Sequence, residues 1–311
     1  MRALITGATG FIGRHLVSAL LESGDELVCL IRGNVTSHHR AIITEQADLN
    51  DPRVFDALES KIGKINVVFH LAAALPSAGL SRHQFEEING AATERLLVLA
   101  NRLGASHFVY GSSLSVLGWP KILPVTEEHP LDPATDYGLS KLRGERACEA
   151  MRCSGAIAAS SLRLSSPYGP GMGDSAVLPR FVAKALKGGR VEWYGSGSRA
   201  QDFVHVSDVV TGLRAAAVTC DPGVFNIASG TTLSMRALAE RVTREVPGST
   251  AHGAQDPDPQ EGIVWEVAIS AARHRLGYYP KIAFDHGLRD YIAFARDGQR
   301  HDAWWTAEKT S

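Results

Sequence analysis

The N-terminal segment constrains the fold of this chain more than any other part of it. A short apolar stretch leads into Gly7-Ala-Thr-Gly10-Phe-Ile-Gly13, and an amphipathic stretch follows. A glycine turn between a strand and a helix is typical of a dinucleotide-binding unit: Gly7 permits the tight turn, Gly10 lets the backbone approach a pyrophosphate, and Gly13 lets the helix pack closely. The amides at the helix start then face the anion. The expected cofactor-binding residues of this turn are Gly7, Thr9, Gly10, Phe11, Ile12 and Gly13.

Short apolar runs alternate with longer amphipathic stretches through the first half of the chain. We expect strands over Ala3 to Thr6, Glu26 to Ile31, Val67 to Leu71, Phe108 to Tyr110 and Ala158 to Leu164, with helices over Gly13 to Ser23, Phe85 to Leu103 and Tyr137 to Cys153. This alternation predicts an α/β fold with a doubly wound parallel sheet of the Rossmann type.

The strand-helix rhythm breaks after Pro167, where the chain becomes rich in glycine. We expect a smaller C-terminal substrate-binding lobe here, at the carboxyl edge of the sheet, where open α/β sheets bind their ligands. The expected Rossmann domain covers residues 1–165, with a return segment at about 203–225, and the lobe covers 166–202 and 226–311. Trp304 and Trp305, near the C-terminus, indicate packing or a partner contact rather than chemistry.

Composition excludes several classes of function. A net charge of -1, with both signs mixed, gives no field that would attract nucleic acid or an anionic membrane. No apolar run is long enough to span a membrane, and the chain enters its first strand without room for a signal peptide, so we expect a cytoplasmic protein. The four cysteines lack the spacing of a metal site, and we expect reduced packing residues and no metal at Cys29, Cys148, Cys153 and Cys220.

A tyrosine and a lysine four residues apart, Tyr137 and Lys141, share one face of an expected helix. A free phenol with a pKa near ~10 is a poor base, but a neighbouring ammonium, together with an oxidised nicotinamide, stabilises the phenolate. Tyr137 would then exchange a proton with a substrate oxygen while hydride moves to or from carbon. Ser113, after the fourth strand, would orient that oxygen. We therefore expect Ser113, Tyr137 and Lys141 to be the catalytic residues, with Tyr137 and Lys141 also contacting the cofactor.

The choice of cofactor depends on the end of the second strand. Arg32 stands where an NAD enzyme usually places an acidic residue against the ribose 2'-hydroxyl, and a guanidinium can pair with a 2'-phosphate instead. NADP(H) is therefore favoured over NAD(H), although a solvated strand-end arginine is the alternative. Asp48 follows the next strand and could accept a hydrogen bond from the adenine amino group, or it is a plain turn aspartate.

An ordered series of motifs resembles the extended short-chain dehydrogenases/reductases of the NAD(P)-dependent epimerase/dehydratase family, over roughly residues 1 to 292. The matching segments are Gly7 to Gly13, Phe69-His-Leu-Ala-Ala73, Asn89-Gly-Ala-Ala-Thr93, Ser112-Ser-Leu-Ser-Val-Leu-Gly118, Tyr137 to Lys141, Arg163 with Pro167-Tyr-Gly-Pro170, Asp202-Phe-Val-His-Val206 with Asp208, Asn226-Ile-Ala-Ser-Gly230 and Leu276-Gly-Tyr-Tyr-Pro280.

The resemblance implies a Rossmann cofactor domain, the Ser113, Tyr137, Lys141 triad, and a homodimer formed through the helices near 85 to 103 and 137 to 153. It extends the expected cofactor contacts to Asp48, Leu49, Leu71, Ala72, Ala73, Asn89 and Pro167. The substrate contacts it suggests are Leu75, Ser113, Ser115, Ser166, Arg180, Arg199 and Gln201.

The chain departs from the family pattern where sugar-nucleotide members hold the diphosphate. Ser166 replaces a usual asparagine, Gln201 replaces a usual arginine, and a second usual arginine near Asp258 is missing. Each lost arginine removes a charge-assisted bond worth ~1.5–3 kcal/mol. Arg180, Arg190 or Arg199 could substitute. Leu114 and Ser115 stand where 4,6-dehydratases place an acidic pair, which disfavours dehydration.

Three hypotheses follow. The first is NADPH-dependent reduction of a ketone on a sugar-nucleotide-like or polyhydroxylated natural-product intermediate. The second is a nucleotide-sugar 4-epimerase that holds NAD tightly. The third is a cofactor-binding regulator without turnover, which the intact triad disfavours. The sequence does not identify the small-molecule substrate, the stereochemistry or the direction of reaction.

Overall fold

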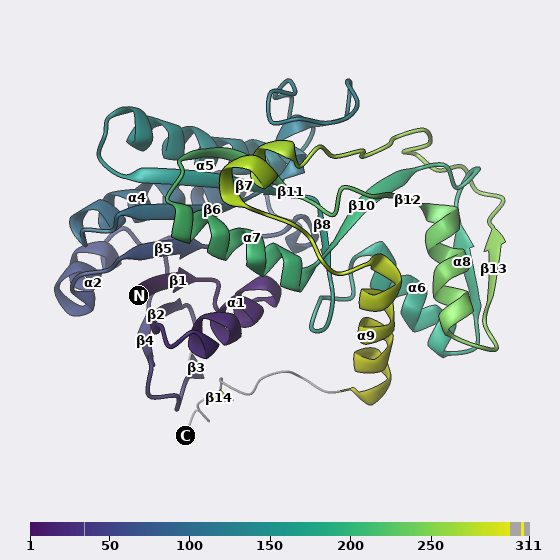
Figure 1. Cartoon of the computed structure of the whole chain (residues 1–311), viewed down its shortest axis with the longest axis horizontal. Coiled ribbons are helices and arrows are strands. Elements are labelled where there is room, and N and C mark those ends of the chain that lie inside the picture. Colours follow the sequence, from purple (N-terminus) through teal and green to yellow (C-terminus); the bar gives the residue numbers. More distant parts are fainter. Residues whose placement is uncertain (34, 299–305, 308–311) are drawn as a thin grey trace.

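A computed structural model describes residues 1–33, 35–298 and 306–307, so Trp304 and Trp305 lie outside the described residues. Its centre is a seven-stranded, wholly parallel sheet in the order β11-β7-β6-β5-β1-β2-β4. The strands are β1 (Arg2–Thr6), β2 (Glu26–Ile31), β4 (Ile42–Gln46), β5 (Val67–His70), β6 (His107–Ser113), β7 (Ala158–Leu164) and β11 (Gly223–Ile227). Figure 1 shows this sheet as the larger of two parts of the molecule. The predicted doubly wound Rossmann sheet is confirmed.

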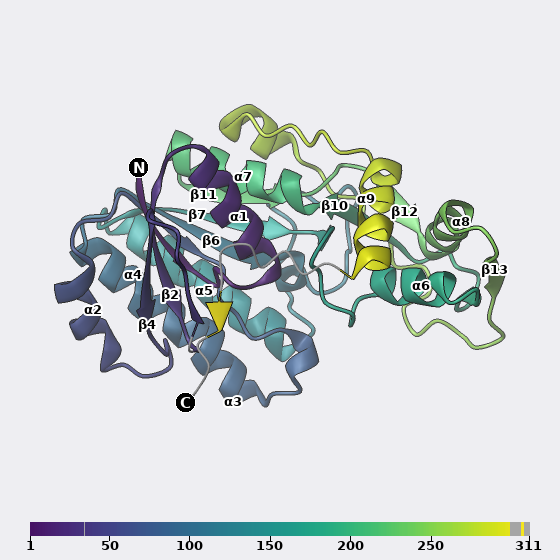
Figure 2. The ribbon, with the colours of Figure 1, turned by 90° about the horizontal axis from the view of Figure 1, so that it is seen from below.

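Helices cover both faces of the sheet, because its strands are apolar on both sides. One face packs against α1 (Phe11–Glu22) and α7 (Val206–Thr219), and the other packs against α2 (Val54–Ile62), α4 (Ala92–Arg102) and α5 (Asp136–Cys153). Figure 2 shows α1 and α7 on one side of the strands and the other three helices opposite them. Between β5 and α4 lie the short turns η1 (Pro76–Ala78), α3 (Arg82–Phe85) and the π-helical η2 (Glu86–Ala91), and η3 (Leu114–Leu117) follows β6.

The helix expected from Phe85 to Leu103 is therefore present, but it widens into a π turn over Glu86–Ala91. Gly90 lies in that turn, and a Cβ added there would meet Arg143 Cδ of α5 at 2.5 Å. The close approach of the two segments explains why a small residue stands at this point, and π turns of this kind often occur at functional sites.

The smaller lobe is built on two short sheets. One has the order β12-β10-β8 and the other pairs β13 with β9, as β8 (Ser166–Tyr168), β9 (Arg190–Trp193), β10 (Ala200–His205), β12 (Thr232–Ser234) and β13 (Thr250–Gly253). Three helices, α6 (Val177–Leu186), α8 (Met235–Glu245) and α9 (Phe284–Asp297), pack with these strands around their own apolar core. Figure 1 shows them at the opposite end of the molecule from α2.

Two segments lie differently from the expected division of the chain. Phe203 to His205 belong to β10 and pair with β8 of the smaller lobe, whereas Val267 to Tyr278 return to the main core, where η4 (Ala272–Leu276) packs against α7. The segment from Val267 to Tyr278 thus links the smaller lobe to the edge of the main sheet that carries β11.

The remaining expectations concern cysteines, metals and membranes. The cysteines are free, but Cys153 is exposed and is therefore not the packing residue we expected. Within the described ranges, no cluster of three or more histidine, cysteine or carboxylate side chains is placed to hold a metal. Across the same residues, no helix combines the length and apolar character needed to cross a membrane.

A final short pair, β3 (Val35–Thr36) with β14 (Thr306–Ala307), joins the C-terminal segment to the loop after β2.

Candidate active site

The glycine turn lies where the strand order of the sheet reverses, between β1 and β5. Gly7 has a φ of 72°, and a Cβ there would lie 2.7 Å from the backbone nitrogen of Ala72. A Cβ on Gly13 would collide with the carbonyl oxygen of Gly7. Only glycine permits both approaches, and Gly10 beside them is exposed at the start of α1. The turn is therefore shaped to hold an anionic group against its backbone amides.

The segment after β5 forms the other wall of this crevice. The backbone amide of Ala72 donates a hydrogen bond to Thr6 Oγ1, which also lies 2.7 Å from His70 Nδ1. His70 is fully buried, and burial lowers its pKa to about 3, so the ring is neutral. A neutral imidazole between two hydroxyls fixes the β1 and β5 ends, and with them Leu71, Ala72 and Ala73, against the glycine turn.

Asn89 has a different environment from the one expected of a cofactor contact. Its side chain is 1% exposed, and its amide bonds with the backbone N–H and C=O of Ala74 and with Ser140 Oγ. Those bonds join the loop after β5 to α5, the helix that carries Tyr137 and Lys141. In this structure Asn89 therefore orders the walls of the site.

Arg32 and Asp48 follow the neighbouring strands β2 and β4. Arg32 is exposed immediately after β2. Asp48 is also exposed and accepts a hydrogen bond from the backbone amide of Asn50 at 3.0 Å, which is the geometry of a turn aspartate. Leu49 beside it is half-buried against the core of α2.

Ser113 and Tyr137 are brought together by two caps and one close packing contact. Ser113 ends β6, and its Oγ accepts the backbone amide of Ser115, while Thr135 caps α5 so that Tyr137 lies in its first turn. Gly138 allows α5 to approach η3, since a Cβ there would meet the carbonyl oxygen of Ser115 at 2.5 Å. Burial raises the pKa of Tyr137 to about 12, and a hydrogen bond with Ser113 acts in the opposite direction.

Lys141 is buried one turn further along α5, and its Nζ lies 4.3 Å from the centre of the Tyr110 ring. Burial lowers the pKa of Lys141 to about 8, while the charge of Glu145 acts in the opposite direction. The pKa of Tyr137 is thus raised and not lowered, and stabilisation of its phenolate by Lys141 stays a prediction. Its ammonium lies over the aromatic face of Tyr110, and its contact with a cofactor ribose stays a prediction.

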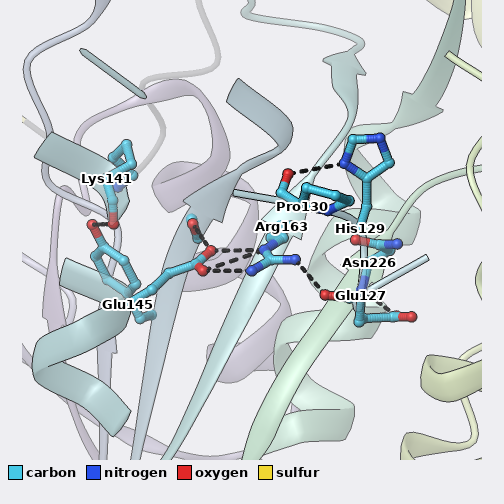
Figure 3. Close-up of polar contacts among 9 residues, drawn as sticks. Glu127, His129, Pro130, Lys141, Glu145, Arg163 and Asn226 are labelled. Atoms are coloured by element: carbon cyan, nitrogen blue, oxygen red, sulfur yellow. Dashed lines mark hydrogen bonds and ion pairs between the residues drawn. The ribbon is translucent and has the colours of Figure 1, made fainter. Parts of the chain in front are cut away.

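A buried ion pair that sequence reasoning missed lies behind these residues. Arg163 of β7 donates from Nε to Glu145 Oε1 at 3.0 Å and from Nη2 to Oε2 at 2.8 Å. Ser112 Oγ also donates to Glu145, and Arg163 Nη1 donates to the backbone carbonyl of Glu127. Figure 3 shows Arg163 between Glu145 and Glu127, whose carboxylate accepts the amide of Asn226. No spacing along the chain indicates this pair, because its two residues are 18 positions apart on different elements.

The expected substrate residues divide between two places. Leu75 is 56% exposed in the loop after β5, and Ser115 has a buried Oγ that lacks a hydrogen-bond partner among the described residues. Ser166 Oγ lies 3.5 Å from Gln201 Oε1 across β8 and β10. Pro167 follows in β8, whose continuation reaches α1 through a 2.8 Å contact between Pro170 O and His15 Nε2.

Arg180 and Arg199 line a separate pocket of about 360 Å³ in the smaller lobe. Arg199 donates from Nε to Asp258 at 2.8 Å and from Nη1 to Gln260 at 3.1 Å. Arg190 is exposed on β9. Arg180, Arg190 and Arg199 were the expected substitutes for the missing phosphate-binding arginines. Of these, Arg199 is already paired with a carboxylate.

Comparison with known proteins agrees with this geometry. A sequence model described as the NAD dependent epimerase/dehydratase family matches residues 3–228. A UDP-glucose 4-epimerase of Mycolicibacterium smegmatis is 30% identical over 96% of this chain and 99% of its own length, and a dTDP-glucose 4,6-dehydratase of Streptomyces griseus is 29% identical over 97% and 95%.

Solved structures give the same result. The protein MoeE5, in complex with UDP-glucose and NAD, superposes with a TM-score of 0.80 at 30% identity, covering 96% of this chain and 99% of the other. A UDP-glucose 4-epimerase of Thermotoga maritima superposes with a TM-score of 0.82 at 25% identity, covering 96% and 99%. The chain is thus an enzyme of the oxidoreductase or epimerase type, and it belongs to the NAD-dependent epimerase/dehydratase family of extended short-chain dehydrogenases/reductases.

Proposed function

We propose that this enzyme reduces a ketone on a polyhydroxylated or sugar-nucleotide-like intermediate, with NADPH as its cofactor. The observation that carries the proposal is the placement of Ser113, Tyr137 and Lys141 at the end of β6 and along α5, on the sheet edge that also carries the glycine turn. That edge is where ligands of open parallel sheets bind.

The roles of the three residues follow from their environment. A pKa near 12 keeps Tyr137 protonated at neutral pH, so its O–H can donate a proton to the carbonyl oxygen as that oxygen gains charge. Ser113 is already hydrogen-bonded beside Tyr137 and would hold the same oxygen in line. Lys141 would contact the cofactor ribose and add positive charge beneath the phenol. A bound nicotinamide cofactor would supply the hydride.

The preference for NADPH rests on Arg32. Its exposed guanidinium at the end of β2 has room to pair with a ribose 2'-phosphate, and no acidic side chain occupies that strand end. The substrate side supports a reductase as well, because Ser166 and Gln201 form a neutral contact where a diphosphate would favour arginines.

A nucleotide-sugar 4-epimerase with tightly bound NAD is the second candidate. The relatives favour it, since two are named UDP-glucose 4-epimerase and MoeE5 was solved with UDP-glucose and NAD. Identifying the nucleotide released from purified, denatured protein separates the two functions. Exchangeable NADPH supports the reductase, whereas stoichiometric NAD that survives dialysis supports the epimerase and overturns the first proposal.

We also propose that the enzyme is a homodimer that pairs α4 and α5 with the same helices of a second copy. Val98, an apolar side chain that is 44% exposed on α4, supports this interface. Light scattering after size exclusion should give twice the 33.4 kDa mass of the chain, and Val98→Glu should shift it toward the monomer.

A further inference from the structure

The ammonium of Lys141 is buried together with one aromatic ring. Lys141 is 3% exposed, and its Nζ lies 4.3 Å from the centre of the ring of Tyr110, a fully buried residue of β6. Glu145, one turn further along α5, accepts hydrogen bonds from Arg163 at both carboxylate oxygens. The Tyr110 ring partly replaces the water that the ammonium loses, because a ring face attracts cations, and does so more strongly where water is excluded.

The Tyr110 ring is held in one orientation by the elements around it. Its hydroxyl lies 3.4 Å from the backbone carbonyl oxygen of Lys141. Gly144 lets α5 close on the ring, since a Cβ there would lie 2.5 Å from Tyr110 Cζ. His70 of β5 stacks on the same ring, with centroids 5.6 Å apart and planes inclined by 27°. The ring is therefore a fixed surface for the side chain of Lys141.

The histidine that stacks on Tyr110 carries no opposing charge. His70 Nδ1 lies 2.7 Å from Thr6 Oγ1, and Nε2 lies 2.9 Å from Thr93 Oγ1. Burial and then the charge of Lys141 lower the pKa of His70 to about 3, so the imidazole is neutral at physiological pH. A protonated imidazole would compete with Lys141 for the ring, whereas the neutral one leaves the ring face to the ammonium.

Other titratable groups act on Lys141 from its own helix. Burial lowers the pKa of Lys141 to about 8, and the charges of Glu145 and Cys148 act in the opposite direction. Arg163 of β7 is paired with Glu145, and Tyr137 precedes Lys141 by one turn of α5. An ammonium that titrates this close to neutral pH gains from any further group that favours its charged form, and the Tyr110 ring is such a group.

We propose that Tyr110 is a positioning residue for Lys141: its buried ring face binds the ammonium and keeps it charged and in one place before a cofactor binds. A cofactor then meets a preformed cation, and little free energy is lost in ordering a long side chain on binding. Tyr110 itself need not touch the cofactor or the substrate. This inference rests on the proposed function for the role of Lys141 as a cofactor contact, and it adds a residue that acts through Lys141.

The test follows the titration of Lys141 by NMR in the full-length, cofactor-free protein with isotope-labelled lysine. The Lys141 signal is the one that is missing from Lys141→Met. Tyr110 is replaced by phenylalanine and by phenylalanines with one, two or three ring fluorines, which keep the shape of the ring and withdraw electrons from its face. The midpoint of the Lys141 titration should fall stepwise along this series, by roughly 1 pH unit in total, because each fluorine weakens the attraction for the cation.

Phe108 is the matched control, because it is fully buried two residues earlier on β6 and also contacts the His70 ring. The same fluorinated phenylalanines at position 108 should leave the Lys141 midpoint nearly unchanged. Two outcomes overturn the proposal: a midpoint that stays constant along the series at position 110, or an equal shift along the series at position 108.

The binding of the cofactor is measured separately, with whichever of NADPH and NADH wild type binds more tightly. At pH 8.5 its affinity should fall along the series at position 110 by up to about 10-fold, as the charged fraction of Lys141 falls. A shifted midpoint with unchanged affinity would support the role of Tyr110 and overturn the proposed contact of Lys141 with the cofactor. The NMR titration needs neither cofactor nor turnover, so its result is independent of the proposed reduction.

Discussion

Glu145 and Arg163 form a buried, bidentate ion pair between helix α5 and strand β7, with side chains 5% and 3% exposed. The pair orients α5 from behind, because Ser112 of β6 and the carbonyl of Glu127 complete its hydrogen bonds. Tyr137 and Lys141, the proposed catalytic residues, lie on the same helix.

Breaking this pair on one side should destabilise the whole protein. Glu145→Gln leaves the Arg163 charge buried without a counter-ion, and we expect a loss of about 3–5 kcal/mol in the free energy of unfolding, measured by denaturant titration. Glu94→Gln, which breaks the exposed pair with Arg143, should cost less than about 1 kcal/mol. Equal losses in the free energy of unfolding would mean that the buried Glu145 pair contributes no more to stability than the exposed pair.

Tyr137→Phe should lower turnover by roughly 10²–10⁴-fold, because it removes the proton donor and keeps the ring that packs on Phe85. Cofactor affinity, measured by fluorescence titration, should stay nearly the same. Tyr279→Phe removes a hydroxyl from a tyrosine that is 56% exposed and should leave turnover unchanged. Near wild-type turnover in Tyr137→Phe would remove this phenol from the mechanism.

Lys141 should make stability depend on pH in the alkaline range. Its pKa is about 8 in the folded protein and 10.5 in its ordinary environment, so between these values the unfolded chain binds more protons. The free energy of unfolding therefore rises with pH across that window. Relative to Lys141→Met, cofactor-free wild type should gain roughly 1–2 kcal/mol between pH 7.5 and 9.5. A flat difference between the two proteins would show that burial does not perturb this ammonium.

Arg32→Asp should move cofactor preference from NADP(H) toward NAD(H). It removes a charge-assisted bond to the 2'-phosphate, places a carboxylate against it, and should weaken NADPH binding by roughly 10–150-fold. Titration of both cofactors at one ionic strength measures this. Arg190→Asp makes the same charge change on an exposed strand of the other lobe and should have little effect. A wild type that already prefers NADH would leave Arg32 as a solvated residue.

Gly13→Ala should abolish cofactor binding or strongly destabilise the protein, because its Cβ would overlap the carbonyl oxygen of Gly7. Gly173→Ala is the control, since an added Cβ there meets no atom within 4 Å. Circular dichroism melting and cofactor titration of both variants check the prediction. Normal binding by Gly13→Ala would mean that the turn can widen without loss.

The sequence alone determined the doubly wound sheet, the glycine turn and the Tyr137, Lys141 pair. Those features depend on local pattern: apolar runs of strand length, glycines at fixed offsets, and a spacing of one helical turn. The same reasoning predicted the helix over the Phe85 to Leu103 stretch but not its π turn, where Gly90 lies against Arg143, a residue remote in sequence.

Only the tertiary structure decided which charged groups meet. The partners in the Glu145 and Arg163 pair are 18 residues apart, and those in the Arg199 and Asp258 pair are 59 apart. Neither separation corresponds to the period of a helix or a strand, so the sequence pattern does not predict either pair. The pKa of a buried group depends on the same long-range assembly: Lys141 loses its water only when α5 packs on β6. Backbone pattern is a local property, whereas charge pairing and desolvation are properties of the folded whole.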